Sequence, residues 1–125
     1  MTKVIKKAQI LFAHGARDPR WAAPFQRLQQ MTQVSLPDVT VALAFLEFMT
    51  PSLPDLVKQM VDNDITEISI VPIFLGQGGH VLRDLPILLD QLRSDYVSLT
   101  IKVAEAVGED AMVLAAIRDY CIKSM

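Results

Sequence analysis

The segment AQILFAHGARDP, residues 8–19, contains the pattern on which the fold depends. A short apolar run ends at His14-Gly15, and Asp18-Pro19 then supplies a capping side chain followed by a proline suited to the first position of a helix. An apolar run that leads directly into a helix start is typical of a strand followed by a crossover helix. The same alternation continues along the chain and predicts an α/β fold with a mainly parallel sheet.

Four short runs are nearly continuously apolar or rich in Val and Ile, as strands are when helices cover both faces of their sheet. We therefore expect a single domain over residues 1–125, with a four-stranded, mainly parallel sheet and helices on both of its faces. The predicted strands cover residues 8–13, 40–46, 67–71 and 98–103.

The helix expected after the second strand has the clearest pattern. Thr50-Pro51 repeats the start signal of a capping residue and a proline. Apolar residues then recur with the spacing i, i+3, i+4, i+7 and i+8, which places them on one helical face. These residues are Leu53, Leu56, Val57, Met60 and Val61.

Pro86 determines where the next helix is expected to begin. The proline would interrupt a helix that started at Gly79, whereas Asp84 as N-cap would place it in the tolerant first turn. We therefore expect a loop over residues 76–83. A last helix is expected from about Glu109. Its apolar face would carry Val113, Leu114, Ile117 and Cys121.

The composition narrows the function classes. Lys and Arg number 12 against 14 Asp and Glu, so the net charge of -2 provides no basic surface for nucleic acid or anionic membranes. No apolar run approaches the ~20 residues that span a bilayer, and the first is too short for a signal peptide. Cys121 is the only cysteine, so we expect no disulfide within the chain, a buried thiol and a reducing cytoplasm.

Three potential metal ligands follow three of the predicted strands. His14 follows the first strand, Glu47 ends the second, and His80 follows the third, with equal spacings of 47−14 = 33 and 80−47 = 33 residues. Such a spacing matches the ~30 residues of a βαβ unit, so all three emerge at the carboxyl edge of the sheet, where α/β folds bind ligands. Two imidazoles and a carboxylate suit Zn, Fe, Co or Ni and leave open coordination positions.

The glycines and arginines at this edge each have two interpretations, one as ligand contacts and one as structural residues. Gly76, Gly78 and Gly79 favour a sharp turn or the close approach of a bulky ligand over a phosphate loop, since no P-loop or dinucleotide motif is present. Three arginines flank the same edge and could pair with ligand carboxylates, or they could be solvated or bound to neighbouring Asp18 or Asp84. These arginines are Arg17, Arg20 and Arg83.

Three segments closely resemble the signature regions of the small CbiX-type sirohydrochlorin chelatases, relatives of the class II chelatases. They read LFAHGARDPRW, AFLEFMTPSL and VPIFLGQGGHVLRDLP, and the resemblance covers nearly the whole chain. It implies a chelatase-like lobe in which His14 and His80 bind metal and Glu47 acts as ligand or proton acceptor. Many members read HGS after the first strand, whereas this chain has Ala16 and lacks that hydroxyl.

The resemblance also implies an enzyme, a lyase that inserts a divalent metal into sirohydrochlorin during cobalamin or related tetrapyrrole biosynthesis. Cobalt is expected before nickel or iron, the metal is a substrate, and no organic cofactor is implied. Short members of the family pair as homodimers around the tetrapyrrole. The residues expected to contact the macrocycle are Arg17, Arg20, Phe48, Met49, Leu75, Gly78, Gly79, Val81 and Arg83.

Two other functions remain open on the sequence. A non-catalytic carrier of metal or tetrapyrrole could use the same residues without turnover. A hydrolase or phosphotransfer domain could use His14 as nucleophile or base, although no Ser, Cys or Lys constellation accompanies it. Multiple turnovers would distinguish the enzyme from the carrier, and activity retained after chelation of metal would indicate the hydrolase.

Overall fold

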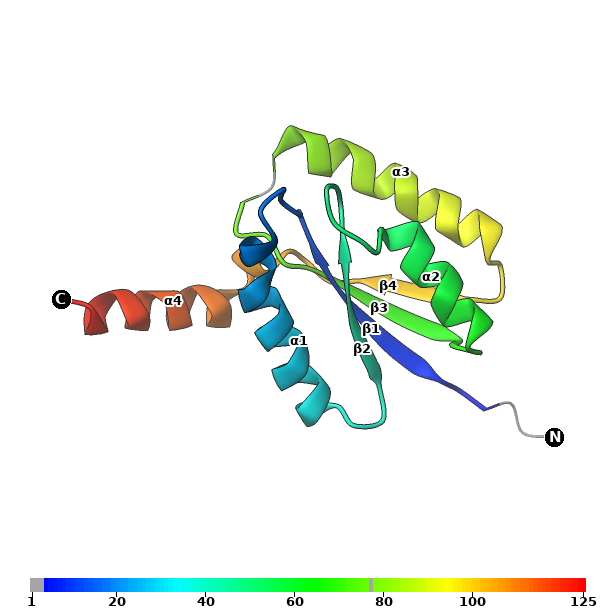
Figure 1. Cartoon of the computed structure of the whole chain (residues 1–125), viewed down its shortest axis with the longest axis horizontal. Helices are drawn as coiled ribbons and strands as arrows, with labels where there is room; N and C mark the ends of the chain where they lie inside the picture. The colour runs from blue at the N-terminus through cyan, green and yellow to red at the C-terminus, as the bar shows by residue number, and fades with distance from the viewer. Residues whose placement is uncertain (1–3, 77) are drawn as a thin grey trace.

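The computed structural model describes residues 4–76 and 78–125, and of His80 and Leu82 it describes the backbone alone. Its strands pair in parallel and lie in the order β2-β1-β3-β4 (Figure 1). The four predicted strands are confirmed, with ends that differ by one or two residues from those expected. The strands are β1 (Lys7–Ala13), β2 (Thr40–Phe45), β3 (Glu67–Pro72) and β4 (Thr100–Val103).

The strand order places a reversal of the chain beside β1. The first crossover carries the chain from β1 to β2 on one side, and the second carries it back past β1 to β3 on the other. Ligands of open α/β sheets bind outside the carboxyl ends of strands at such a reversal. His14, which directly follows β1, therefore lies at the position that this topology favours for a ligand.

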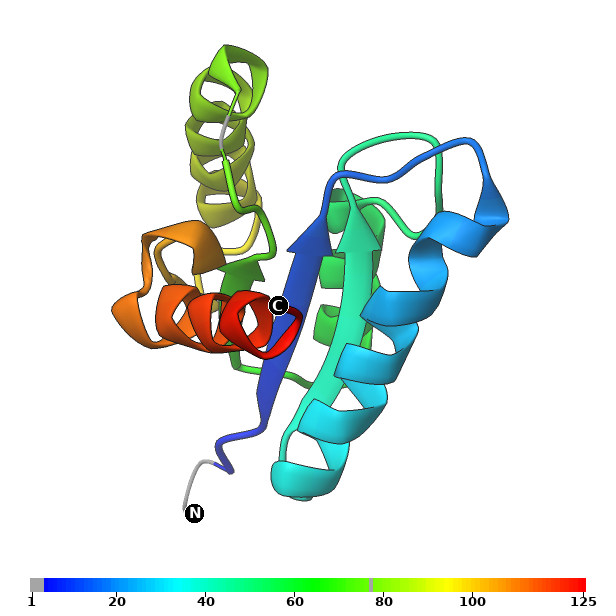
Figure 2. The same cartoon turned by 90° about the vertical axis from the view of Figure 1, so that its left-hand side faces the viewer.

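The helices cover both faces of the sheet, as expected. The helices α2 (Leu53–Asp62) and α3 (Gly79–Asp95) bury their apolar residues with Ile10, Phe12 and Ile70 of the sheet. The helix α1 (Ala23–Ser35) lies on the opposite side of the sheet from α2 (Figure 2). Its main sheet contact is β2, where Gln29 and Gln33 hydrogen-bond the strand backbone.

The start of α1 differs from the simple helix that Asp18-Pro19 predicts. Asp18 caps a short 3-10 helix, η1 (Pro19–Ala22), by accepting a hydrogen bond from the backbone N–H of Arg20 at 2.9 Å. The α-helix follows, and Pro24 is its second residue, where a proline needs no backbone donor.

The apolar face predicted for α2 is confirmed, but the helix starts two residues later than the signal at Thr50-Pro51 predicts. Ser52 is the N-cap, and its hydroxyl accepts a hydrogen bond from the backbone N–H of Asp55. The Thr50-Pro51 bond lies in the preceding turn and is cis. Leu53, the first helical residue, is fully packed against the core.

The loop predicted over residues 76–83 is wrong from Gly79 onward, because α3 begins there and contains Pro86 in its interior. A helix that begins early brings Val81 to the same face as Leu85, and both side chains are buried. Burial of a valine contributes about 1.5–3 kcal/mol. This is comparable to the ~3 kcal/mol that an interior proline costs, so the burial of Val81 can offset the cost of Pro86 within the helix.

The C-terminal helix α4 (Ala111–Lys123) follows η2 (Val107–Glu109), and Asp110 caps it. None of its described residues is buried, and Cys121 is exposed, so the prediction of a buried thiol is wrong. The helix extends away from the sheet (Figure 1), and its main contact is η2. Within the described part of the chain, no helix has the length and apolar character needed to cross a membrane.

Candidate metal site at the carboxyl edge of the sheet

His14 and Glu47 are brought together by the parallel pairing of β1 and β2. The pairing continues past the strand ends, because the N–H of Leu46 donates to the carbonyl of Ala13 and that of Glu47 to the carbonyl of His14. The Nε2 of His14 lies 2.9 Å from the Oε1 of Glu47, a hydrogen bond when that nitrogen carries the proton. Both side chains are partly open to solvent, at 45% and 39% exposure, so an incoming ion can reach them.

Gly15 permits this close contact between the two strand ends. Its φ is +94°, and a Cβ at this position would lie 1.8 Å from the carbonyl oxygen of Glu47. Any larger residue would therefore push the backbone of Glu47 away from His14. Gly15 was not among the residues predicted for the site, although its place directly after His14 was a signal for such a role.

Phe74 is a second residue of the site that sequence analysis missed. It follows β3, on the other side of the chain reversal, and its ring stands edge-on to the imidazole of His14 with centroids 6.5 Å apart. The ring of Phe12 in turn packs edge-on against Phe74 at 5.9 Å. The imidazole is thus held between a carboxylate and a buried aromatic pair. In the sequence, the available signal for Phe74 was its place as an aromatic residue shortly after a strand.

The two donor atoms have a spacing that suits a shared metal ion. Adjacent ligands with bonds of ~2.0–2.2 Å to one ion lie roughly 3–3.4 Å apart, which is close to the separation of His14 and Glu47. The predicted third ligand, His80, lies in the first turn of α3, but its side chain falls outside the described residues. Among the side chains described, no group of three or more His, Cys, Asp or Glu is gathered for a metal.

Arg17, Phe48 and Met49, three of the residues predicted to contact the substrate, lie together in the structure. They line a pocket of about 370 Å³ between the loops that follow β1 and β2. The guanidinium carbon of Arg17 lies 4.9 Å from the centroid of the Phe48 ring, a cation–π contact. Phe48 has a φ of 66°, and this left-handed backbone conformation, uncommon for a bulky residue, turns the loop after β2.

Arg20 and Arg83 instead have carboxylate partners within the chain. Arg20 forms a two-pronged pair with Asp18, with the shortest N–O distance at 2.7 Å, and this guanidinium lowers the pKa of the carboxyl. The Nε of Arg83 donates to Asp84 at 3.2 Å. The interpretation that these two arginines pair locally is therefore favoured over that of free ligand-binding groups, whereas Arg17 lies over the ring of Phe48.

The remaining predicted substrate contacts are divided between surface and core. Leu75 is exposed, and Gly78 and Gly79 have open space where a side chain would be. Neither glycine has a positive φ, and both have room beside them for a ligand. Val81 is buried in the core at 4% exposure and packs α3 against the sheet, so it does not face solvent.

The sequence model of the CbiX family matches residues 8–123 of the chain. A sirohydrochlorin cobaltochelatase from Methanocaldococcus jannaschii is 29% identical over 90 residues, which cover 72% of this chain and 63% of the relative. The corresponding protein of Sulfolobus acidocaldarius is 23% identical over 93% of this chain and 90% of the relative. The chain thus spans less than two thirds of the Methanocaldococcus relative but most of the Sulfolobus one.

Solved structures give the same likeness. A chain described as a cobalamin (vitamin B12) biosynthesis CbiX protein from Marinobacter aquaeolei has a TM-score of 0.83 and 31% identity, with 94% of this chain and 96% of that chain covered. The sirohydrochlorin chelatase SirB from Bacillus subtilis, in complex with cobalt, has a TM-score of 0.81 at 22% identity. This chain covers 51% of SirB, so the likeness concerns the fold of one half of that protein.

Proposed function

Because the chain belongs to the CbiX family, we propose that it is a chelatase that inserts a divalent metal ion into sirohydrochlorin, with cobalt as the first candidate. The relatives named as sirohydrochlorin cobaltochelatases support the reaction class and the macrocycle. The proposal places the reaction in the cytoplasm, within cobalamin or related tetrapyrrole biosynthesis, and treats residues 1–125 as one catalytic lobe.

The observation that carries the proposal is the pair of His14 and Glu47 at the carboxyl edge. An imidazole nitrogen and a carboxylate oxygen 2.9 Å apart, both partly exposed, can bind one ion while leaving most of its coordination sphere open. A site that must release its metal to a macrocycle needs such an incomplete set of ligands. His80, one βαβ unit further along the chain, is the proposed third ligand.

Insertion of M²⁺ requires that two pyrrole protons leave the macrocycle, so the site must also accept protons. A carboxylate that binds a metal cannot at the same time take a proton on the same lone pair. We therefore propose that His14 and His80 are the lasting ligands of the ion, and that Glu47 takes one proton once its oxygen no longer binds the ion. The second proton leaves to solvent through the exposed side of the pair.

The pocket lined by Arg17, Phe48 and Met49 is the proposed position of the macrocycle edge. Arg17 supplies a cation for a peripheral carboxylate of the macrocycle, and the exposed Phe48 ring supplies an apolar surface against it. Met49, Leu75, Gly78 and Gly79 extend this surface on either side of the metal. Arg20 and Arg83 could contact the macrocycle only if they exchanged their present carboxylate partners.

Multiple turnovers test the proposal directly. With sirohydrochlorin and Co(II) both in large excess over protein, the absorbance change of metal insertion should continue for many equivalents. A burst limited to one equivalent per chain would indicate a carrier of metal or tetrapyrrole and would contradict the chelatase. Retained activity on other substrates after chelation of all metal would point to the hydrolase considered from the sequence.

The identity of the metal follows from a comparison of rates, since ligand type alone does not select it. Any nitrogen–oxygen site binds divalent metals in the Irving–Williams order, so affinity cannot distinguish the physiological ion. Insertion rates should be measured for Co(II), Ni(II) and Fe(II) with the same macrocycle. We expect Co(II) to be fastest, in line with the names of the relatives.

We further propose that two copies of the chain pair as a homodimer. The pocket lined by Arg17, Phe48 and Met49 is open and measures a few hundred Å³, whereas a tetrapyrrole needs enclosure on both sides. A second lobe would supply the other side.

A further inference from the structure

Two side chains in the described part of the chain contact the imidazole of His14, and they act on different parts of the ring. Glu47 contacts Nε2 at 2.9 Å, whereas the ring of Phe74 stands at 81° to the imidazole, with centroids 6.5 Å apart. Nε2 is also the atom that would bind the ion, and it has a single in-plane position for either a proton or a metal. The hydrogen bond to Glu47 therefore ends when the ion binds, whereas the contact with Phe74 uses no nitrogen and persists.

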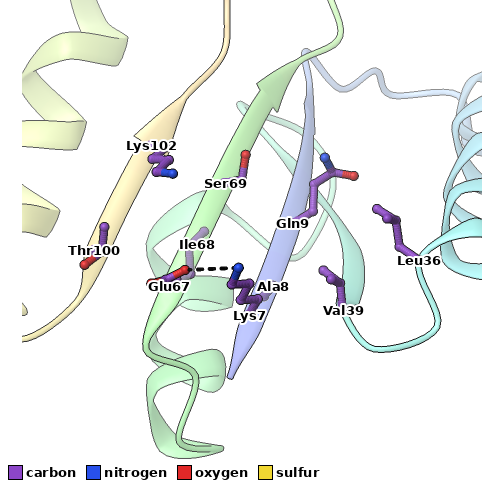
Figure 3. A pocket seen from close by; sticks show the side chains of 10 residues that line it. All are labelled: Lys7, Ala8, Gln9, Leu36, Val39, Glu67, Ile68, Ser69, Thr100 and Lys102. Atoms are coloured by element: carbon purple, nitrogen blue, oxygen red, sulfur yellow. Dashed lines mark ion pairs between the residues drawn. The ribbon is translucent and has the colours of Figure 1, made fainter. Parts of the chain in front are cut away.

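The place of Phe74 beside the imidazole follows from the register of β1 and β3. Gln9 lies beside Ser69 in this register, a difference of 69−9 = 60 positions (Figure 3). The pairing continues past the end of β3, because the backbone N–H of Ile73 donates to a carbonyl of β1 at 2.8 Å. The same difference, 74−14 = 60, places Phe74 opposite His14. The main chain of the sheet therefore brings the two rings together.

Phe74 is itself held on both sides. It is 7% exposed, and the ring of Phe12 packs against it at 83°, with centroids 5.9 Å apart. The backbone N–H of Gly108 in η2, which leads into α4, donates to the carbonyl of Phe74 at 2.9 Å. Aromatic pairs in this edge-to-face arrangement have a preferred geometry. Phe74 is therefore a fixed surface against which the half-exposed imidazole of His14 lies.

We propose that Phe74 is a positioning residue of the metal site, which holds the plane of the His14 imidazole while the ion binds and leaves. The torsion that turns an imidazole about its Cβ–Cγ bond has broad preferences, so the ring plane is fixed only by its neighbours. An imidazole nitrogen binds an ion in the plane of its ring, so a ring that turns freely must be ordered again for each ion. This inference rests on the proposed function, because it takes His14 as a ligand of the metal substrate.

The first test reads the imidazole itself, without metal or macrocycle. The chain has two histidines, so its imidazole groups give two sets of ¹H–¹³C signals, and His80→Ala identifies the set that belongs to His14. Phe74→Leu removes the aromatic ring and keeps an apolar side chain. We expect the His14 signals to shift, because the ring current is lost, and ¹³C relaxation to show larger motion of the imidazole. An imidazole that moves no more than in the unmodified chain would overturn the proposal.

Calorimetric titration with Co(II) measures the consequence for metal binding. We expect Phe74→Leu to weaken Co(II) binding about three- to tenfold, the size of one aromatic contact, and Phe74→Tyr, which keeps the ring, to retain most of the affinity. Phe74→Leu should have little effect on the Co(II) affinity that remains in His14→Ala, because it acts through the imidazole. An equal loss in both backgrounds would overturn the proposal. A carrier without turnover would still show these effects, so the chelatase proposal can fail separately.

Met60→Ala is the matched control for a general loss of stability. Met60 is 4% exposed, and its carbonyl accepts a hydrogen bond from the N–H of Ile65 shortly before β3, at the opposite edge of the sheet from His14. Truncation of this core side chain should lower the melting temperature at least as much as Phe74→Leu does. We expect it to leave the Co(II) affinity and the imidazole signals of His14 unchanged. A loss of Co(II) affinity equal to that of Phe74→Leu would reduce Phe74 to a structural residue.

Discussion

The Nε2 of His14 lies 2.9 Å from the Oε1 of Glu47, although the two residues are 33 positions apart in the sequence. The contact follows from backbone pairing that continues beyond the ends of β1 and β2. Because the main chain fixes the approach of the two residues, substitutions of either side chain should report on chemistry more than on folding.

Substitution of His14 and of Glu47 should affect different steps. We expect His14→Ala to lose most Co(II) binding, because it removes a metal ligand. Glu47→Gln keeps the size and the hydrogen bond but cannot take a proton, so insertion should slow about 10²–10⁴-fold with metal binding less affected. Calorimetry with Co(II) and the absorbance change of insertion check the two steps. Lys58→Ala, on the far side of α2, is the control. If it lost Co(II) binding or insertion rate to the same extent, the roles assigned to His14 and Glu47 would be refuted.

A double-mutant cycle tests whether His80 binds the same ion as His14. If both are ligands, either single change to Ala should remove most of the Co(II) affinity, and the double variant should be little worse than each alone. Independent, additive losses would place His80 outside the metal site. Co(II) titration of the four proteins, with thermal melts to confirm folding, provides the measurement.

Gly15→Ala should destabilise the lobe and disturb the metal pair together. The substitution strains a backbone with φ +94° and places a Cβ against the carbonyl oxygen of Glu47. We expect the free energy of unfolding to fall by more than about 1 kcal/mol in urea denaturation. Gly76→Ala, where an added Cβ has open space, should be nearly neutral. A neutral result at Gly15 would show that the strand ends adapt more easily than this geometry implies.

Arg17 and Arg20 should differ in their effect on substrate binding. Arg17→Ala removes the cation beside Phe48 and should raise KM for sirohydrochlorin several-fold, whereas Arg20→Ala should change it little because Asp18 occupies that guanidinium. Arg20→Ala should instead raise the pKa of Asp18 toward its ordinary value, which NMR titration can follow. The reverse order of the two KM effects would contradict the site described here.

The strands and the pairing of His14 with Glu47 could be predicted from the sequence because their signals are local or periodic. Strands covered by helices on both faces leave continuous apolar runs, and a βαβ unit has a nearly constant length. Parallel strand ends then bring residues with that spacing to one edge. These regularities hold without any knowledge of which side chains touch.

The parts that could not be predicted depend on contacts between distant segments. The start of α3 is set by the burial of Val81 in the core, which a local signal at Pro86 does not reveal. The need for Gly15 arises from the backbone of Glu47, a strand away. The exposure of Cys121 follows from the direction of α4, although the apolar pattern of that helix is the same as that of a core helix.

Phe74 connects the metal site with the segment that leads into α4. Its ring stands against His14, and its carbonyl accepts the hydrogen bond from Gly108 at the root of α4. The segment that leads into α4 and the imidazole of the metal site therefore share one residue, so a substitution that shifts Gly108 should also be felt at His14.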